Sequence, residues 1–454
     1  MMFTSGWLSH IFTDHQLADE SQSIEQVTTD SRVKTNSSLF IPIIGEHFNG
    51  HDFAEQAVEN GAVALLWDSS HQVPDRIGDH VSVFFVEDTL KAMQELATKY
   101  RDVVDPIVIG ITGSNGKTTT KDLVSQVAGS TFRTHHTYGN LNNDIGMPLT
   151  ILNMAPRTQV LILEMGMNHF GEIERLSRIA KPDYAIITNI GESHIEFLGS
   201  RKGISQAKRE ILIGMEHEGT ILIDGDEPLL SDIKNISHVI KCGFNDDNDV
   251  IVGNPVYEGQ IMRFTLSNGQ TFSIPLLGKH NALNATFAIT IGRLLGIDDT
   301  EIINALKTTE HTAMRFEMKS GPSGVSLVND AYNASPTSMK AAIDVVKQLP
   351  GYKEKVLVLG DILELGDDSE AFHRSVAQVI DNEITAVYTY GNESKAIIDC
   401  LQERTQSITV KHFNTKEALI TQLHSHLKVD TIILFKASRK MQFETIVDSL
   451  QAFD

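Results

Sequence analysis

The sequence predicts an α/β protein of three domains, each built around a largely parallel β-sheet. Short, continuous apolar runs such as Ile107–Thr112 and Val160–Glu164 alternate with helix-like stretches. That pattern is typical of parallel strands covered by helices on both faces. The chain has 454 residues, a length that suggests two to four domains of ordinary size. The pattern changes twice along the chain, which divides it into three blocks.

The first block, residues 1–101, is expected to be an N-terminal α/β substrate domain, with strands at 38–44, 62–67 and 81–86 and helices at 53–59 and 90–100. The second, residues 102–310, is expected to be a central domain with strands at 107–112, 160–164, 185–188 and 220–224, followed by a β-rich insertion at 250–275. The third, residues 311–454, is expected to be Rossmann-like, with strands at 326–330, 355–359, 386–390 and 431–435.

Composition excludes several functional classes. Acidic residues outnumber basic ones, 59 to 38, and the net charge of −21 argues against a nucleic-acid partner or an anionic membrane surface. Cys242 and Cys400 are too few for a disulfide framework, which favours a reducing compartment. The first basic residue is Arg32, so no signal peptide is expected, and no apolar run approaches the ~18 residues of a membrane span. We expect a cytoplasmic protein without membrane insertion.

Polar residues follow the apolar strands of two blocks. They stand at the ends of the central strands and of the C-terminal strands: Thr112, Glu164, Thr188, Asn189, Asp330 and Asp361. Ligands of open α/β sheets bind beyond the carboxyl ends of the strands. Two such edges facing each other would form a cleft between domains, although polar loops after strands are also common in the absence of a site.

A glycine-rich segment directly follows the first central strand. It consists of Gly113, Ser114, Asn115, Gly116, Lys117, Thr118 and Thr119, and a helix-like stretch comes after it. Strand, glycine-rich loop and helix are the context of a phosphate-binding loop, in which backbone N–H groups and the helix N-terminus bind phosphate oxygens. Lys117 would reach the β- and γ-phosphates of ATP, and the Thr118 hydroxyl would bind Mg²⁺. The strict motif fails at one place, because Ile111 stands where its first glycine should be.

Two strand-end residues are candidate metal ligands. Glu164 ends the second central strand and is placed like the acidic residue that holds Mg²⁺ beside a phosphate-binding loop, although a lone carboxylate can also cap a loop. His194 follows another strand end. A single histidine is more often structural than a ligand, so by itself His194 carries little weight.

Lys208 lies within an apolar helical stripe. The stripe is spaced i, i+3, i+4, i+7, i+8 and i+11 and consists of Ile204, Ala207, Lys208, Ile211, Leu212 and Met215. Burial would lower the pKa of the Lys208 amine and make it a better nucleophile. The alternative, which periodicity alone favours, is a lysine at the edge of the stripe that extends its ammonium group into solvent.

These residues resemble the Mur ligase superfamily, the ATP-dependent amide-forming enzymes of peptidoglycan precursor synthesis. Residues 112–119 match the variant phosphate loop of that family, which explains the missing glycine. Further matching segments are 29–32, 139–146, 164–166, 278–285, 330–336 and 359–366. Segments 139–146 and 330–336 point to the member that joins D-alanyl-D-alanine to UDP-N-acetylmuramoyl-tripeptide through an acyl phosphate. The chain departs from the family pattern at Ser335, Ile362 and Ala437, which concerns local dipeptide contacts.

The resemblance implies a role for each matching residue. Four residues would be catalytic: Lys117, His194, Lys208 and Arg315. ATP would be bound by residues 113–119 together with Asn284 at the adenine, Arg315 at the phosphates, and Asp330. Two Mg²⁺ ions would be held by Thr118, Glu164, His194 and Lys208, the last as a carbamate formed with CO₂. The nucleotide-sugar peptide would contact Asp30, Ser31, Arg32, Gly45, Asn49, His51, Asn140, Asn142, Asn143 and Asn333.

Two other functions remain open at this point. Folylpolyglutamate synthase shares the superfamily phosphate loop, but the block of about 100 residues before the loop, with Asp30, Ser31 and Arg32, argues against it. A non-catalytic ATP-driven switch is the other, and Lys208 and Arg315 argue for chemistry instead. The sequence does not decide between lysine and diaminopimelate in the tripeptide, and a monomer is expected.

Overall fold

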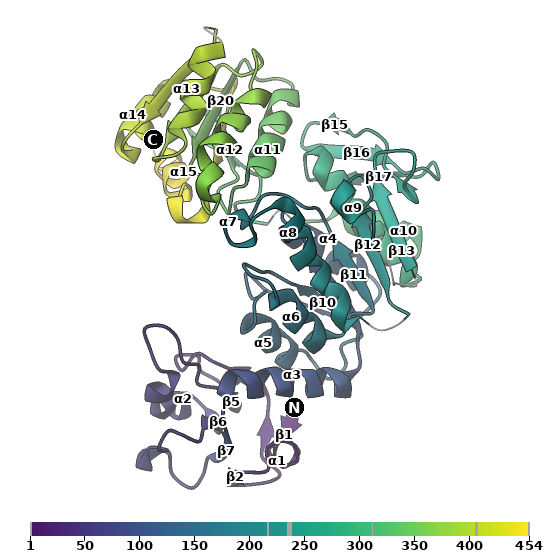
Figure 1. Ribbon diagram of the computed structural model, residues 1–454, viewed down its shortest axis with the longest axis vertical. Coiled ribbons are helices and arrows are strands. Elements are labelled where there is room, and N and C mark those ends of the chain that lie inside the picture. Colours follow the sequence, from purple (N-terminus) through teal and green to yellow (C-terminus); the bar gives the residue numbers. More distant parts are fainter. Residues whose placement is uncertain (1, 216–217, 234–237, 311, 405–406, 453–454) are drawn as a thin grey trace.

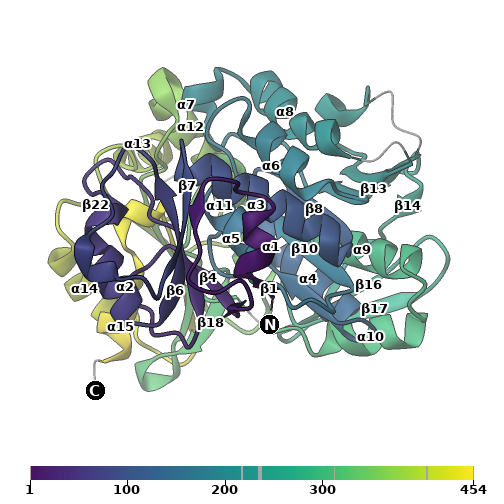
Figure 2. The ribbon, with the colours of Figure 1, turned by 90° about the horizontal axis from the view of Figure 1, so that it is seen from below.

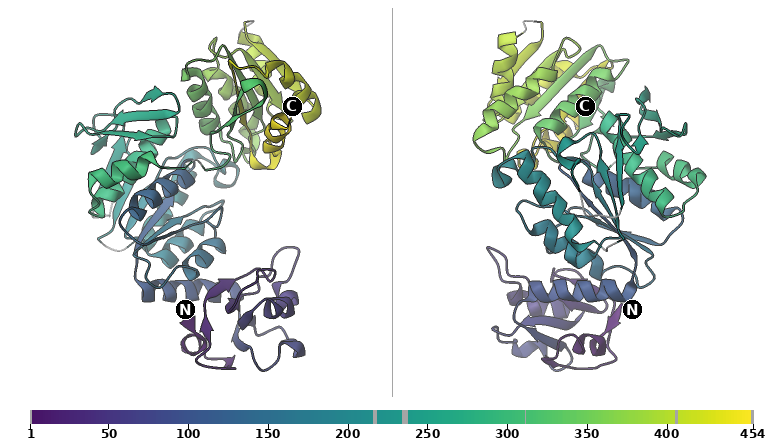
Figure 3. Two further views of the ribbon diagram at one scale, coloured as in Figure 1. Left: turned by 180° about the vertical axis from the view of Figure 1, so that it is seen from behind. Right: turned by 45° about the vertical axis from the view of Figure 1, so that its right-hand side comes forward.

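The computed structural model describes residues 2–215, 218–233, 238–310, 312–404 and 407–452. The three predicted domains follow one another along the long axis of the molecule (Figure 1), and the views from behind and from the side agree (Figure 3). Each domain contains its own sheet, which confirms the predicted α/β class. Within the described residues, no helix is both long and apolar enough to cross a bilayer.

The N-terminal domain has a five-stranded sheet in the order β2-β7-β6-β5-β4. The strands are β2 (His15–Gln16), β4 (Gln26–Thr28), β5 (Ser38–Phe40), β6 (Ala62–Asp68) and β7 (Ser82–Val86). All neighbours are parallel except β2 and β7. A small antiparallel pair, β1 (Phe3–Thr4) with β3 (Ser23–Ile24), and two helices, α1 (Ser5–Ser9) and α2 (Ala54–Glu59), complete the domain, which lies in front when the molecule is seen from below (Figure 2).

Helix α3 (Thr89–Val104) connects the N-terminal and central domains. Asp88 caps its first turn, and Asp105 ends it in the left-handed conformation. The buried Tyr100 donates a hydrogen bond to the carbonyl of Met154 at 2.9 Å, and the Arg101 Nε donates to the carbonyl of Ala180 at 3.1 Å. The helix therefore packs on the central domain. It runs through the predicted domain boundary between residues 101 and 102, and the position of that boundary stays a prediction.

The central domain has a seven-stranded, wholly parallel sheet in the order β14-β13-β12-β11-β8-β10-β9. Its strands are β8 (Ile107–Thr112), β9 (Thr134–His136), β10 (Val160–Glu164), β11 (Tyr184–Ile187), β12 (Thr220–Asp224), β13 (His238–Gly243) and β14 (Val250–Ile251). Its helices are α4 (Lys117–Gly129), α5 (Gly146–Leu152), α6 (Glu172–Ala180), α7 (Ile195–Leu198), α8 (Arg201–Arg209), α9 (Lys279–Leu294) and α10 (Asp299–Lys307). The predicted β-rich insertion forms a separate antiparallel sheet of β15 (Val256–Glu258), β16 (Ile261–Thr265) and β17 (Thr271–Ile274).

The C-terminal domain has a six-stranded sheet in the order β18-β19-β23-β20-β21-β22, parallel except for the edge pair β18 and β19. Its strands are β18 (Glu317–Ser320), β19 (Ser326–Asn329), β20 (Glu354–Gly360), β21 (Ala386–Tyr390), β22 (Thr409–Phe413) and β23 (Thr431–Lys436). Its helices are α11 (Pro336–Gln348), α12 (Ser369–Val376), α13 (Lys395–Arg404), α14 (Lys416–Leu423) and α15 (Glu444–Gln451). Separate apolar clusters cover the two faces of this sheet, as the Rossmann-like prediction requires.

Two predicted elements differ from the structure. The strand expected at 38–44 ends at Phe40, because the chain turns from there into the loop that carries Gly45. The helical stripe expected from Ile204 to Met215 is α8 only as far as Arg209, and a short 3₁₀ helix (Glu210–Gly214) continues it. The shorter helix still buries the face that was predicted to be apolar.

Candidate functional site

The phosphate loop lies between β8 and α4, as the sequence predicted. Gly113 has a φ of +152°, and a Cβ atom there would lie 1.8 Å from the Thr188 Oγ1. Gly116 has a φ of +81° and immediately precedes the first residue of α4. Both positions require glycine, since other residues are strained at these φ values and the space beside Gly113 is filled.

The loop rests on the residues that follow β11. The backbone N–H groups of Ser114 and Asn115 donate to the backbone carbonyl and side-chain oxygen of Asn189, at 3.1 and 3.0 Å. The Thr188 hydroxyl donates to the Asn115 carbonyl at 2.6 Å, and the Ser114 hydroxyl accepts from the Gly191 N–H at 2.8 Å. The Asn115 Nδ2 is buried and finds no hydrogen-bond acceptor in the described part of the chain, so the loop presents an unused donor.

Lys117 folds back over the loop. Its Nζ donates to the carbonyl of Gly113 at 2.9 Å. Desolvation lowers the pKa of the amine, and the nearby Glu164 carboxylate acts in the opposite direction. The ammonium group therefore lies at the loop, where the phosphates of a nucleotide would bind.

Thr118 of the central domain makes a hydrogen bond to the C-terminal domain. Its hydroxyl donates to Glu164 Oε2 at 2.8 Å and accepts from Arg315 Nη2 at 2.8 Å. The other Glu164 oxygen accepts from the Asn142 amide at 2.8 Å. Glu164 is 3% exposed, so a carboxylate is buried directly beside the phosphate loop. Four predicted site residues from distant parts of the chain are thus within hydrogen-bond reach of one another.

Arg315 enters this network from the segment that begins the C-terminal domain. Its guanidinium lies over the ring of Tyr332, 4.2 Å from the centroid, which holds the side chain flat. Its Nε is buried and has no hydrogen-bond partner among the residues that the structure describes. The two neighbours, Met314 and Phe316, have φ values of +59° and +53°, conformations that residues with side chains seldom adopt. Strain of this kind gathers at functional sites, where the surrounding structure holds it.

Asp330 supports the Arg315 segment. Its carboxylate accepts from the Phe316 N–H at 3.1 Å and from the Lys436 Nζ at 2.6 Å. Lys436 also donates to the carbonyl of Asn333 at 3.2 Å. Through Phe316 and Lys436, Asp330 and Asn333 lie near Arg315, and within the described residues neither donates a hydrogen bond to the phosphate loop or accepts one from it. Asp361, the other strand-end acid, instead binds the backbone N–H groups of residues 392–394 within its own domain.

His194 contacts the C-terminal domain. Its Nδ1 lies 2.6 Å from Glu364 Oε2. This hydrogen bond is the largest influence lowering the pKa of Glu364. Sequence reasoning did not assign Glu364 a role, because only the fold brings it to His194, which is 170 positions away.

Lys208 is buried, with 2% of its surface exposed, which rules out the solvent-facing alternative. Burial, with a contribution from the charge of Lys117, places the pKa of its amine well below the usual value. Among the residues that the structure describes, Lys208 has neither a hydrogen-bond acceptor nor an ion-pair partner. This environment disfavours the charged form of the amine.

The other predicted residues of the central domain lie around the loop. Asn284 is 3% exposed, and its Oδ1 would be 2.8 Å from a Cβ at Gly116, so it packs against the loop. Asn143 accepts from the Gly146 N–H at 2.8 Å and thereby caps α5. Asn140 is exposed, and its carbonyl accepts from the Asn142 N–H at 2.8 Å. Thr119 lines a small cavity next to Arg315. The roles assigned to these residues stay predictions.

The predicted substrate residues of the first block lie in the N-terminal domain, away from the phosphate loop (Figure 1). Asp30 and Arg32 form an exposed ion pair with two hydrogen bonds of 2.8 Å, and these bonds lower the pKa of Asp30 to about 2. The Ser31 hydroxyl donates to Gln56 Oε1 at 2.7 Å. Gly45 donates its N–H to the carbonyl of Phe48 at 2.9 Å, which closes a turn.

Asn49 and His51 form part of a polar cluster that sequence reasoning missed. His51 stacks on His71 with 4.2 Å between the ring centroids, and its Nδ1 is 2.7 Å from Asn49 Oδ1. The Asn49 Nδ2 is 3.0 Å from His71 Nε2. His51 is 4% exposed, so in this structure it is a buried residue that stabilises the loop carrying Gly45 and Asn49. The spacing of the sequence does not indicate that His71 contacts His51, because helix α2 and strand β6 lie between the two histidines along the chain.

The site suits Mg²⁺ bound together with a nucleotide. The described residues contain no cluster of three or more His, Cys, Asp or Glu side chains that would hold a metal alone. Mg²⁺ commonly uses one or two protein ligands, the remainder being phosphate oxygens and water. The buried Glu164 and the Thr118 hydroxyl meet that requirement. The unpaired donors of Asn115 and Arg315 are suited to phosphate oxygens.

Comparisons with known proteins agree with this geometry. Three family models match: "Mur ligase family, catalytic domain" over residues 23–101, "Mur ligase middle domain" over 111–292 and "Mur ligase, glutamate ligase domain" over 314–439. The UDP-N-acetylmuramoyl-tripeptide–D-alanyl-D-alanine ligase of Bacillus subtilis is 45% identical over 433 residues, which cover 95% of this chain and 94% of that protein.

Two solved structures are similar along nearly their whole length. The crystal structure of MurF from Acinetobacter baumannii has a TM-score of 0.86 and 29% identity, and covers 99% of this chain and 98% of its own. MurF from Thermotoga maritima in complex with ADP has a TM-score of 0.83 and 27% identity, and covers 94% of this chain and 97% of its own. With three matched domains and a curated relative at 45% identity, the chain belongs to the Mur ligase family.

Proposed function

We propose that this protein is an ATP-dependent ligase that joins D-alanyl-D-alanine to UDP-N-acetylmuramoyl-tripeptide, in peptidoglycan precursor synthesis. The observation that carries the proposal is the meeting of Glu164 and Arg315 at the hydroxyl of Thr118. A carboxylate suited to a metal ion and a cation from a second domain thus lie at one phosphate loop, which supports the proposal. The substrates are those named for the 45% identical ligase of Bacillus subtilis.

The reaction needs ATP because a free carboxylate has no adequate leaving group. A carboxylate oxygen of the tripeptide attacks the γ-phosphorus of ATP, the bond to the β-phosphate oxygen breaks, and ADP leaves. The amine of D-alanyl-D-alanine then attacks the carbonyl carbon of the acyl phosphate. Collapse of the tetrahedral intermediate expels phosphate, and the amine loses a proton. No enzyme nucleophile is required.

The residues at the loop serve the first of these steps. Lys117 and Arg315 place positive charge where two anions must approach each other. Bound Mg²⁺ would be held by Thr118 and Glu164, with His194 and Lys208 assigned to the second of two ions, and would supply further charge neutralisation. Arg315 belongs to the third domain, so docking of that domain against the central domain supplies this cation to the site and would help to exclude water from the acyl phosphate.

Lys208 is proposed to carry a carbamate. Its neutral amine would attack CO₂, forming an N–C bond and releasing one proton, and the product is an anion suited to a cation site. The support is its depressed amine pKa, its 2% exposure and the lack of a partner among the described residues. An uncompensated ammonium group at this depth would be strongly unfavourable.

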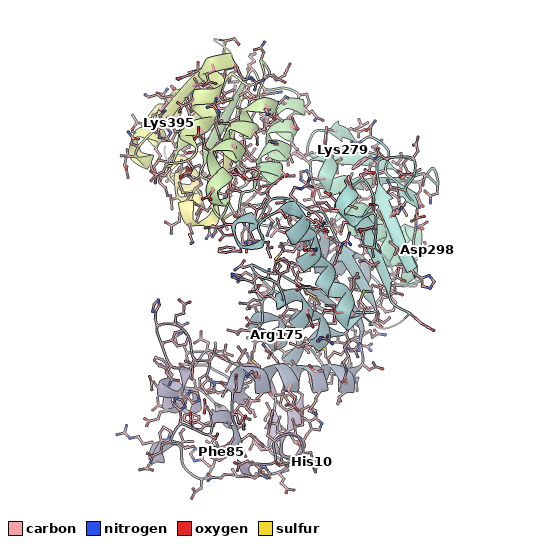
Figure 4. The ribbon with its side chains drawn as sticks, viewed as in Figure 1. His10, Phe85, Arg175, Lys279, Asp298 and Lys395 are labelled. Carbon is pink, nitrogen blue, oxygen red and sulfur yellow. The ribbon has the colours of Figure 1, made fainter. Side chains whose placement is uncertain are left out.

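The substrate contacts complete the proposal. Asp30, Ser31 and Arg32 would hold the uridine end, beside the loop that carries Gly45, Asn49 and His51. Asn140, Asn142, Asn143 and Asn333 would orient the peptidyl end, and Asn284 would contact adenine. Figure 4 shows Arg175 on the side of the central domain nearer the N-terminal domain and Lys279 on the side nearer the C-terminal domain.

The deciding experiment measures ADP release with UDP-N-acetylmuramoyl-tripeptide, with and without D-alanyl-D-alanine. When both substrates are present, we expect one ADP and one phosphate to be released for each amide bond formed. When D-alanyl-D-alanine is left out, we expect no such release. ATP binding without ADP release for any such pair would favour a nucleotide switch. Turnover with a folate and glutamate instead would favour a folylpolyglutamate synthase, an alternative that no observation of this structure supports.

A further inference from the structure

Glu364 lies in the segment 359–366, which the sequence singled out and the proposed function leaves without a role. The segment follows β20 of the C-terminal domain. Glu364 Oε2 is 2.6 Å from the Nδ1 of His194, which precedes α7 of the central domain. A separation of 2.6 Å is short for a nitrogen–oxygen hydrogen bond and typical of a charge-assisted one.

Both partners have an unusual backbone. The φ of His194 is +65° and that of Glu364 is +64°, so each residue adopts the left-handed conformation that favours glycine. A second contact supports the pair, since the Glu196 N–H donates to the carbonyl of Glu364 at 3.3 Å. Two strained residues that bind each other across a domain boundary indicate that this arrangement is held for function.

We propose that Glu364 is a positioning residue that orients the imidazole of His194 for the ATP–Mg²⁺ site. By accepting a hydrogen bond from the Nδ1–H group, the Glu364 carboxylate keeps the proton on that nitrogen and leaves Nε2 as the nitrogen with the free lone pair. Outer carboxylates fix the tautomer of metal-binding histidines in this way. The inference rests on the proposed function in one respect, namely that His194 serves the nucleotide site.

The contact is more than a means of docking the C-terminal domain. Other bonds already tie the two domains: the Thr337 hydroxyl donates to Glu192 Oε2 at 2.7 Å, and the Ser335 hydroxyl donates to Asn115 Oδ1 at 3.2 Å. Loss of the Glu364 carboxylate should therefore release the imidazole while the domains keep their other contacts.

The first test reads the tautomer of His194 directly and needs no activity. Nitrogen-15 NMR of the imidazoles is recorded on the full chain without nucleotide at pH about 8.5, where an ordinary histidine is neutral, and His194→Gln identifies the signal. We expect a protonated Nδ1 in the wild type and in Glu364→Gln, whose amide oxygen can still accept. In Glu364→Ala the proton should move to Nε2, the form that free imidazole favours. An unchanged tautomer in Glu364→Ala would overturn the proposal.

The second test is a double-mutant cycle on ADP release. Glu364→Ala should reduce kcat by about tenfold or more, the usual effect of removing an outer partner of a metal-site histidine. In a His194→Ala background the same change should add almost nothing, because Glu364 acts through His194. A full additional loss in that background would refute the positioning role. Glu403→Ala, which breaks an exposed ion pair with Arg374 in the same domain, is the control and should behave as wild type.

The two tests separate this inference from the proposed function. If the wild-type protein fails to release ADP with the muramoyl substrate, the proposed function fails, while the NMR result still decides whether Glu364 orients His194.

Discussion

Arg315 of the C-terminal domain donates a hydrogen bond to the Thr118 hydroxyl of the central domain at 2.8 Å, across 197 positions of the chain. The same hydroxyl donates to Glu164. A nucleotide that bound Thr118 through a metal would replace these contacts, so we propose that Arg315 meets the phosphates at this network.

Replacing Arg315 by alanine should reduce kcat by ~10³-fold, the effect of removing an arginine that stabilises charge in phosphoryl transfer. Arg315→Lys should recover only part of this loss, since lysine keeps the charge without the planar group that lies over Tyr332. Steady-state ADP release measures both variants. Wild-type turnover in Arg315→Ala would remove this residue from the site.

Lys117→Ala should abolish ligation while the protein stays folded. Within the described part of the chain the amine donates to the Gly113 carbonyl alone, so its loss removes a cation from the loop and little packing. ADP release and the circular dichroism spectrum are measured on the same sample. Lys91→Ala is the matched control, since that side chain is 82% exposed and in another domain. Full activity in Lys117→Ala would refute the phosphate-loop assignment.

Gly113→Ala and Gly296→Ala distinguish steric conflict from backbone strain. Both glycines have positive φ, but a Cβ at Gly296 meets nothing within 4 Å, whereas at Gly113 it would lie 1.8 Å from Thr188 Oγ1. Gly296→Ala should cost about 1 kcal/mol of stability and leave ATP binding intact. Gly113→Ala should lower the melting temperature further and abolish ATP binding by calorimetry. Equal behaviour of the two variants would contradict the loop geometry.

Lys208→Ala should turn over slowly and be partly rescued by short carboxylates, which can supply the anion that the carbamate would provide. Wild-type enzyme should also lose activity in buffer freed of CO₂ and bicarbonate and regain it when bicarbonate is added. Lys202→Ala, an exposed lysine on the same helix, should need no rescue. Undiminished wild-type turnover without bicarbonate would count against the carbamate.

Asp224 should make stability depend on pH. Burial raises the pKa of this carboxyl from 3.8 to about 7, with Asp226 and Glu227 adding repulsion. Between these pH values the folded state binds more protons than the unfolded state, so stability falls as pH rises through the window and levels off above it. Asp224→Asn should remove the penalty and stabilise the protein at pH about 8, by at most about 4 kcal/mol.

The measurement is the melting temperature of wild type and Asp224→Asn at the two ends of that window. The two proteins should melt together at the acid end and diverge at the alkaline end. Asp246→Asn changes an exposed acid of a neighbouring loop and should match wild type throughout. A constant difference at both ends would show that the carboxyl does not titrate as described.

Much of the fold follows from local patterns. The strands Ile107–Thr112, Val160–Glu164 and Thr220–Asp224 have the bounds that their apolar runs predicted, because a strand buried on both faces must be apolar throughout. The phosphate loop was also predictable from local sequence, since its glycines, lysine and threonine all lie within the short segment 113–118. The strand at 38–44 proved too long, because Ile41 and Ile43 are buried in the following loop rather than in the sheet.

By itself, then, the sequence determined the class of fold, the phosphate loop and the apolar stripe that contains Lys208, all of which depend on residues within about one element of each other. The burial of the Lys208 side chain itself was decided only by the tertiary structure. Only the tertiary structure decided that Glu364 binds His194, that Asn189 supports the loop and that His71 stacks on His51. Those contacts depend on strand order and on how the domains dock, and hydrogen bonds of about 3 Å reach distant residues only once the folded chain has brought them together.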